Sequence, residues 1–583
     1  MPLLDTRSFP AQQHWEPSFD GESARFSIED PYQGSSAPHV RRKLHVVICR
    51  LLVELCERFT FFGTVCNMIL FCTIKLSYRN HEAAIVNLCF VGISTLSPVL
   101  IGWMCENCTQ RSRVIYTCAF LHFVGTALLP VVAFPFEDFY IDVHHIAHTL
   151  AKREQSLLFY TGLLMAAIGT GGIRAIICPL SAYSLQGYDW RKFMSFFNWF
   201  YWLVNLNSLV VFMGISYIQQ SVAKNLGFLI PFMSVVMALI TIHMVRNDLL
   251  YQPRKGGSLL VTLGVFTNAV RMCCTNYHHL GGRVNMWLDC AKENNGGWYS
   301  ESHVENTKAL VRLFPLFSFQ LLYRICIMQT SSGYFIQTMN SNLNFYGFLL
   351  PIAAMTIISI IPQLILAPCF EGLNSRFFSK LGYGLTPSSY IICGHLCAAV
   401  SLLVAGIYEL HRNSFPLVEQ TLSGTVLLVS SMPCYQLAPQ YVLLGIAEAL
   451  VLPCCSVITV RLVPGQLRGI AMHFLSLFNA AGCFMGALVA GVAFLASEGN
   501  WYPAFLPMGH LERFYFFLGT LGLLNTLCFW KISHRYNDLD QEMELGFRRS
   551  RLEEKLIQHE RSLKFYESVL DWTYPFSPME TAV

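Results

Sequence analysis

Six of the charged side chains that stand inside long apolar stretches of this sequence are of a type and spacing that could form one polar site. Glu54, Glu57 and Arg58 come close together, and spacings of three and four would place all three on one face of a helix. Glu54 precedes Arg58 by four positions, which is the favourable direction for an ion pair within a helix. Two acids beside a base indicate a site that can take up and release protons.

The other three charges are Arg174, Arg324 and Glu448, each in a different apolar stretch. A charge at the centre of a bilayer costs on the order of 3 kcal/mol, so it rarely faces lipid. One interpretation is that these charges form structural ion pairs between helices. Two acids on one helix, bases on two others and a lone acid half a chain away instead favour a polar cavity that all of them line.

The composition indicates that membrane-spanning helices position these charges. Hydrophobic residues make up 54% of the 583 positions and charged residues only 13%, whereas soluble proteins average about 25% charged. Residues 114–134 and 225–245 contain no Lys, Arg, Asp or Glu over 21 positions each, and a helix needs about 20 residues to cross a bilayer. We therefore expect an all-α, polytopic membrane protein. A secreted domain, a soluble enzyme and a nucleic-acid-binding protein are disfavoured.

Twelve apolar segments divide the chain into two halves. They lie at about 44–73, 83–105, 114–134, 157–182, 193–218, 225–245, 310–338, 344–368, 388–409, 435–460, 467–496 and 513–532. The expected organisation is a disordered tail over 1–43, a six-helix half over 44–245, a polar linker over 246–309, a second six-helix half over 310–532, and a helix and tail over 533–583. Two related halves joined by a linker are typical of transporters.

The distribution of positive charge predicts the orientation in the membrane. With the N-terminus in the cytosol, 29 of the 40 Lys and Arg residues fall on the cytosolic side and seven on the other side. Cytosolic loops are enriched in Lys and Arg, so both termini should be cytosolic. The sequence leaves open whether the membrane is the plasma membrane or an endolysosomal one.

The sequence gives little support for a metal site or a phosphate-binding loop. Most of the 21 cysteines lie in apolar segments, and the pair Cys105/Cys108 has no second pair at zinc-site spacing. The glycine run 169–172 lacks the strand and the G-K-[ST] sequence of a phosphate loop, so these glycines more plausibly let helices approach closely. We expect no metal, no organic cofactor and no enzymatic activity.

Five motifs resemble those of the proton-coupled oligopeptide transporter family, in order and at family spacing across about 44–536. They are ELCERFTFFG at 54–63, GTGGIRAIICPLSA at 169–182, FFNWFYWLVNLNS at 196–208, QLAPQYVLLGIAE at 436–448 and ERFYFFL at 512–518. Residues 323–337, YRICIMQTSSGYFIQ, are similar to the peptide/histidine transporter branch of solute carrier family 15.

The resemblance implies a major facilitator superfamily fold, with 12 transmembrane helices in two six-helix halves. It also implies symport of di- and tripeptides, or histidine, with protons as the coupling ion. Matching positions then acquire roles: proton coupling by Glu54 and Glu57, and substrate binding by Arg58, Arg174, Asn205 and Glu448. In the family the two basic positions bind the substrate carboxylate, the asparagine binds the peptide backbone, and the last acid receives the amino group.

The chain also departs from the family pattern. Phe61 and Phe62 replace paired tyrosines, Arg174 replaces a lysine and Asn207 replaces a glycine. Arginine stays charged at any usable pH, so a step that needs a neutral lysine is lost. The charges are kept, while hydrogen-bonding groups are removed.

Two other functions therefore remain alternatives. The same fold could carry another small organic ion, or it could act as a sensor or scaffold that recruits partners. The C-terminal residues Thr581, Ala582 and Val583 fit a terminal ligand of PDZ domains, which bind by strand addition.

Overall fold

The computed structural model describes residues 37–107, 111–133, 152–183, 190–222, 224–244, 258–276, 286–376, 386–464, 467–503, 506 and 509–536. From Val47 onward the chain belongs to one compact unit. Within the described ranges, eleven helices are long and apolar enough to cross a membrane, as expected for a polytopic protein. Residues 1–36 and 537–583 lie outside the description, and with them the C-terminal helix and the PDZ ligand that the sequence predicts.

The first half consists of long helices with one interruption. Its elements are α1 (Ala37–Val65), α2 (Met68–Ile74), α3 (Asn80–Asn107), α4 (Arg111–Ala133), α6 (Lys152–Tyr183), α7 (Trp190–Val210) and α8 (Lys224–Met244). Helix α1 begins at Ala37, within the tail expected over 1–43, and Pro38 in its first turn suits a helix start. Between α1 and α2, the Asn67 amide donates to the Ser216 carbonyl and to Gln219.

The linker, which the sequence predicts only to be polar, contains a small folded cluster of its own. It is built from α10 (Ser258–Asn276), a 3-10 helix (Trp287–Ala291) and α11 (Glu301–Val311). Val265, Leu288 and Val304 are fully buried between these elements. Beside them, the Lys292 ammonium contacts Asp289 and Glu301, so the cluster combines an apolar core with an ion-pair network.

The second half contains two hairpins between its helices. Its helices are α12 (Phe314–Ile327), α13 (Gly333–Met339), α14 (Thr356–Arg376), α16 (Pro387–Asn413), α17 (Ala438–Arg461), α18 (Arg468–Ala496) and a last helix over Leu511–Tyr536. The segment expected at 344–368 begins with a hairpin of β1 (Asn344–Phe345) and β2 (Phe348–Leu349). Its apolar helical part, Ile352–Leu366, is shorter than the eleven spans, so a count of twelve is not fully reached.

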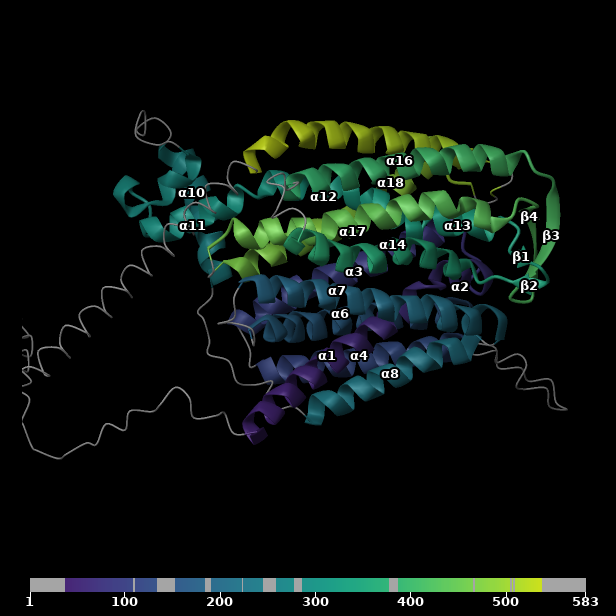
Figure 1. Cartoon of the computed structure of the whole chain (residues 1–583), viewed down its shortest axis with the longest axis horizontal. Coiled ribbons are helices and arrows are strands. Elements are labelled where there is room, and N and C mark those ends of the chain that lie inside the picture. Colours follow the sequence, from purple (N-terminus) through teal and green to yellow (C-terminus); the bar gives the residue numbers. More distant parts are fainter. Residues whose placement is uncertain are drawn as a thin grey trace, which may run out of the picture. The chain divides into compact units, whose positions relative to one another are not determined.

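The longer hairpin pairs β3 (Leu417–Leu422) with β4 (Thr425–Ser430). Its two turn residues, Ser423 and Gly424, have φ angles of 51° and 85°, as a two-residue type I′ turn requires. Figure 1 shows both hairpins at one end of the long helices and α10 and α11 at the opposite end. We call the first of these the hairpin end.

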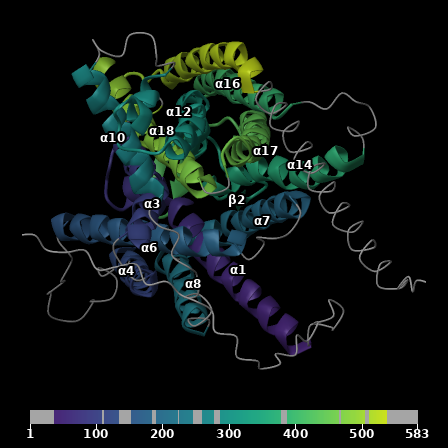
Figure 2. The ribbon, with the colours of Figure 1, turned by 90° about the vertical axis from the view of Figure 1, so that its left-hand side faces the viewer.

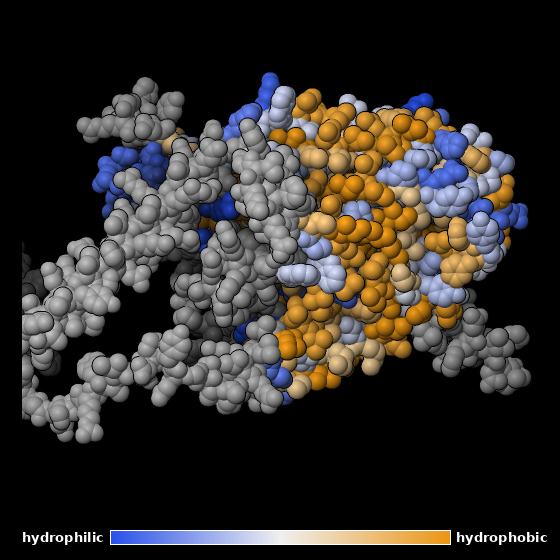
Figure 3. Space-filling model, viewed as in Figure 1, coloured by the Kyte–Doolittle hydropathy of each residue, from blue (hydrophilic) through white to orange (hydrophobic). Residues whose placement is uncertain are grey.

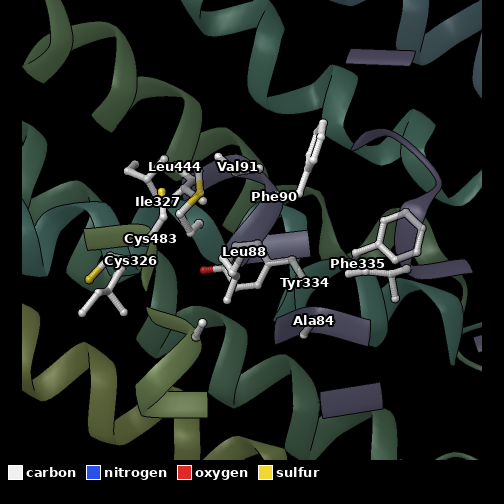
Figure 4. Packing of buried hydrophobic residues seen from close by; sticks show 14 of the residues in the cluster. Ala84, Leu88, Phe90, Val91, Cys326, Ile327, Tyr334, Phe335, Leu444 and Cys483 are labelled. Carbon is white, nitrogen blue, oxygen red and sulfur yellow. The ribbon is translucent and has the colours of Figure 1, made fainter. Parts of the chain in front are cut away.

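Helices from the two halves pack directly on each other. Helix α3 packs against α18, and α7 packs against α14, as the view along the helices shows (Figure 2). One hydrophobic cluster joins the halves: Leu88 of α3 lies in it with Tyr334 of α13 and Cys483 of α18 (Figure 4). The apolar core therefore holds the two halves together.

The halves also meet through polar contacts at the hairpin end. Gln220 lies in a π-helical turn, Ile218–Val222, that follows α7. Its side-chain amide donates to the Leu350 carbonyl and accepts from the Ile352 N–H. The Ser423 hydroxyl at the tip of the β3–β4 turn donates to the Gln220 carbonyl. The rings of His81 and Phe494 stack there at 3.6 Å between centroids.

The outer faces of the helices are apolar. Ile365, Leu396 and Ile407 are among many large hydrophobic residues with exposed side chains. Figure 3 shows hydrophobic side chains spread across the long helices on one face, with hydrophilic residues towards the hairpin end. Such a surface suits contact with lipid.

Candidate functional site

The charges of α1 form the ion pair that their spacing predicts. Glu54 and Glu57 are buried, with 2% and 0% of their surface exposed, while the Arg58 side chain is 24% exposed. Arg58 donates from Nε and Nη2 to Glu54 Oε1, at 3.1 and 3.0 Å. The helical spacing of four residues is therefore used as the sequence analysis expects.

Arg174 of α6 joins this pair from another helix. Its Nε donates to Glu57 Oε2 at 2.9 Å, and Arg58 Nε lies 3.7 Å from the same oxygen. The four side chains thus carry two positive and two negative charges in alternation. Three of their buried polar atoms, Glu54 Oε2, Glu57 Oε1 and Arg174 Nη2, have no hydrogen-bond partner among the described residues.

The glycine run positions Arg174 by allowing close helix packing. A Cβ atom added to Gly169 would collide with the backbone of His122 in α4, and one added to Gly171 would collide with Ser97 in α3. One added to Gly172 would meet Cys118 of α4. The helix-packing interpretation of residues 169–172 is confirmed.

Phe61 contributes in a way that the sequence analysis missed. The Arg174 guanidinium carbon lies 4.5 Å above the centre of the Phe61 ring, and the ring also stacks on Phe90. An arginine over an aromatic face is favoured electrostatically. Replacement of tyrosine by phenylalanine therefore removes a hydroxyl but keeps a surface for the guanidinium.

Asn207 also has a structural partner. Its amide donates to the Leu55 carbonyl of α1 at 2.9 Å and so ties α7 to the helix that carries the acids. A glycine at this position could not make that bond. This departure from the family motif thus strengthens the attachment of α7 to α1.

A second polar group surrounds Glu448 in α17. Gln363 of α14 donates from Nε2 to Glu448 Oε2 at 2.9 Å, and its Oε1 accepts from the Tyr201 hydroxyl at 3.2 Å. Asn205, on the same helix as Tyr201, donates to the Tyr201 carbonyl. Asn205 and Glu448 were predicted from the sequence, but Tyr201 and Gln363 were not. An uncharged Gln within an apolar stretch gives no indication of its hydrogen-bond partners on other helices.

The structure thus brings the six predicted residues into two groups. Glu54, Glu57, Arg58 and Arg174 form the first, and Asn205 and Glu448 belong to the second through Tyr201 and Gln363. Within the described part of the chain, no ion pair joins the two groups. Nor do the described residues contain a cluster of three or more His, Cys, Asp or Glu that could hold a metal ion.

Comparison with known proteins adds an independent line of information. The sequence profile of the POT family matches residues 112–501. Solute carrier family 15 member 5 from Homo sapiens is 55% identical over 545 residues, which cover 94% of this chain and 94% of the human protein.

Solved structures share the fold. An auto-inhibited POT family peptide transporter has a TM-score of 0.62 at 18% identity, covering 84% of this chain and 97% of its own. A POT family transporter in complex with 5-aminolevulinic acid has a TM-score of 0.60 at 16% identity, covering 84% and 96%. The major facilitator fold expected from the sequence is confirmed by these likenesses.

Proposed function

Since the chain belongs to the POT family of membrane transporters, we propose that it is a symporter that moves di- and tripeptides together with protons. One observation carries the proposal: two arginines in the first half and a glutamate in the second half are held in the membrane interior of one transporter fold. A zwitterionic peptide carries a carboxylate at one end and an ammonium group at the other. Arg58 and Arg174 would bind the first, and Glu448 the second.

The ion pairs of α1 supply a way to couple binding to a proton. Glu54 and Glu57 are bonded to the arginines that a substrate carboxylate would need. A proton on Glu57 would cancel its charge and release Arg174 for the substrate. Glu57 Oε1, buried without a partner, is an atom that could carry this proton.

Arg174 itself takes no part in proton exchange. A guanidinium stays protonated at any usable pH, so the proton must reside on the acids. The Phe61 ring would support Arg174 while its carboxylate partner changes from Glu57 to the substrate. The coupling role therefore falls on Glu54 and Glu57.

The amino group would enter the second group of residues. Gln363 donates to Glu448, and a substrate ammonium could take its place with a stronger bond in which donor and acceptor are both ionised. The released Gln363 amide and Asn205 could then bind the peptide backbone. In this scheme Tyr201 holds Gln363 in position from the opposite half.

Alternating access would move the halves around this site. The contacts of Gln220 close the hairpin end, so exchange on that side needs these bonds to break. We place the hairpin end outside the cytosol and both termini inside, on the basis of the Lys and Arg distribution.

The decisive experiment is uptake of labelled substrates into proteoliposomes with an imposed proton gradient. Dipeptides and histidine should be compared in one panel, since the sequence allows either. Gradient-dependent accumulation of peptides is the expected result. Equal uptake with and without the gradient would argue against proton coupling.

Glu448→Gln is the variant to test beside it. It keeps the side chain's shape and removes its charge, so the free energy of peptide binding should weaken by about 1.5–3 kcal/mol, the range for a hydrogen bond to a charged group. Affinity should be measured together with the amount of folded protein in the membrane. Normal abundance with unchanged affinity would remove Glu448 from the site, whereas lower abundance alone would indicate a structural role.

A second candidate substrate class is a small amino acid-like ion. The observation that favours it is the structurally similar POT family transporter in complex with 5-aminolevulinic acid, which has an amino group and a carboxylate but no peptide bond. Uptake of that compound without uptake of peptides would select this alternative. A sensor or scaffold role, with Thr581–Val583 as a PDZ ligand, would be selected by recruitment of partners without flux.

A further inference from the structure

Arg324 is a charged residue of the membrane interior that the proposed cycle does not use. It lies in α12, and its side-chain stem packs against α18 at Gly482, where an added Cβ atom would come within 2.7 Å of Arg324 Cβ. Its Nε atom is buried and has no hydrogen-bond partner among the described residues. The glycine therefore makes room for an arginine whose head group is incompletely paired.

The two arginines of the first group have acid partners. Arg58 and Arg174 form ion pairs with Glu54 and Glu57. Arg324 interacts electrostatically with Glu448 and lies beside the Cys483 thiol, but within the described chain no ion pair joins it to an acid. A carboxylate oxygen of Glu448 accepts instead from Gln363.

A guanidinium held in this way can accept an anion. A charge in the membrane interior is costly unless it is paired, and partial pairing leaves part of that cost uncompensated. The planar guanidinium matches a carboxylate and can donate two parallel hydrogen bonds to it. An incoming carboxylate would therefore find both a charge and an unused N–H donor.

We propose that Arg324 binds the side-chain carboxylate of an acidic residue at the first position of the substrate peptide. The inference rests on the proposed function, in which the peptide's amino group lies at Glu448. The side chain of the first residue leaves from the carbon atom that carries this amino group. The substrate side chain would therefore lie beside Glu448. Arg324 is the cation that interacts electrostatically with Glu448, so it would be near this side chain as well.

The test compares four dipeptides that differ only in charge and position: Glu-Ala, Gln-Ala, Ala-Glu and Ala-Gln. Their affinities would be measured by thermal stabilisation of the purified full-length protein. Glu-Ala should bind at least about tenfold more tightly than Gln-Ala, as expected for one charge-assisted bond. The ratio between Ala-Glu and Ala-Gln should be smaller.

Variants assign the preference to its residue. Arg324→Gln should bring the Glu-Ala to Gln-Ala ratio close to one, and Arg324→Lys should keep part of the preference. Equal binding of Glu-Ala and Gln-Ala by the unmodified protein would overturn the inference. So would an unchanged ratio in folded Arg324→Gln protein, or in the equally uncharged Arg324→Met protein should the glutamine variant not fold.

The outcomes also separate this inference from the proposal on which it rests. Proteoliposome uptake of Gln-Ala without preference for Glu-Ala would uphold peptide transport and overturn the role of Arg324. A preference for Ala-Glu that disappears in Arg324→Gln would keep Arg324 as an anion-binding residue and reverse the orientation of the peptide. Failure of all four dipeptides to bind would overturn both.

Discussion

At the scale of single residues, the site is defined by which polar atoms are satisfied and which are not. Glu57 bonds Arg174 through one carboxylate oxygen and leaves the other buried without a partner. Binding of one proton to this carboxylate would remove its charge and so weaken its pairing with Arg174. The proposed coupling therefore depends on this side chain more than on any other.

Replacing Glu57 with glutamine would imitate the protonated acid permanently. Arg174 loses its partner, so Glu57→Gln should bind peptides at neutral pH at least as tightly as the unmodified protein. Accumulation driven by a proton gradient should be lost, because no proton can leave. Exchange of labelled for unlabelled peptide, which needs no gradient, should persist and serves as the control. Full gradient-driven accumulation by this variant would assign coupling elsewhere.

At the scale of elements, helix contacts set where the charged residues stand. Helix α18 approaches α12 at Gly482, and α6 approaches α3 and α4 at its glycine run. Neither contact leaves room for a methyl group. Small residues at these contacts therefore position Arg324 on α12 and Arg174 on α6. On α1, the spacing along a single helix positions the charged residues.

The contact at Gly482 can be tested with a control on the same helix. Gly482→Ala forces a methyl group against Arg324 and should lower the free energy of unfolding by about 1–3 kcal/mol, as overpacking usually does. An added Cβ atom at Gly469 meets nothing within 4 Å, so Gly469→Ala should be close to neutral. Thermal unfolding in detergent would compare the two. Equal effects would mean that α12 and α18 pack less closely than described.

The linker cluster predicts a pH dependence outside the membrane. Burial raises the pKa of the Asp289 carboxyl, but hydrogen bonds from Lys308 and Lys292 lower it by more, so the net pKa lies below its usual value. A carboxyl with a depressed folded-state pKa contributes stability above its unfolded pKa of about 4. That contribution is lost as the pH falls through the folded-state pKa.

Asp289→Asn should therefore speed amide hydrogen exchange in α10 and α11 at neutral pH while leaving α3 unchanged. The difference from the unmodified protein should stay constant from about pH 8 to about pH 5 and shrink only below about pH 4. Exchange rates corrected for the intrinsic effect of pH would measure it. A difference that already shrinks near pH 6 would point to another titrating group.

At the scale of the whole molecule, contacts at the hairpin end join the two halves. There the Thr73 hydroxyl of α2 lies 4.0 Å from the Met339 sulfur of α13. Transport by alternating access requires this pair to separate in each cycle. The pair therefore reports on the movement of the halves.

Cysteines placed at both positions should cross-link and stop transport. Thr73→Cys/Met339→Cys is expected to lose uptake after oxidation and to regain it after reduction. Each single variant, treated in the same way, controls for the native cysteines. Undiminished uptake by fully cross-linked protein would show that this end does not open during transport.

The sequence predicted those features that depend on local spacing. The pair of Glu54 with Arg58 and the close packing at residues 169–172 follow from helical periodicity and side-chain size. The bonds of Gln363 to Tyr201 and Glu448 could not be predicted, because they join three helices whose relative rotation is set by packing. The same holds for Phe61 beneath Arg174, whose aromatic contact needs the tertiary structure.

The predicted boundaries failed where polar turns interrupt apolar runs. Residues 344–349 are apolar enough to look like the start of a helix, yet Tyr346 and Gly347 have φ angles of 50° and 86° and form a hairpin turn. The second apolar segment is expected to begin near residue 83, whereas α3 begins at Asn80. In both places hydropathy describes the burial of a segment but not its backbone conformation.

The balance of three arginines and three glutamates has an electrical consequence. With Glu54, Glu57 and Glu448 ionised opposite Arg58, Arg174 and Arg324, the empty site has no net charge. The conformational change that turns the unloaded site from one side of the membrane to the other should then be insensitive to voltage. A zwitterionic peptide with one proton adds one positive charge, so a potential of 100 mV would change the energy of the loaded step by about 2.3 kcal/mol. An acidic peptide bound at Arg324 would cancel that charge, and its uptake with one proton should generate no current.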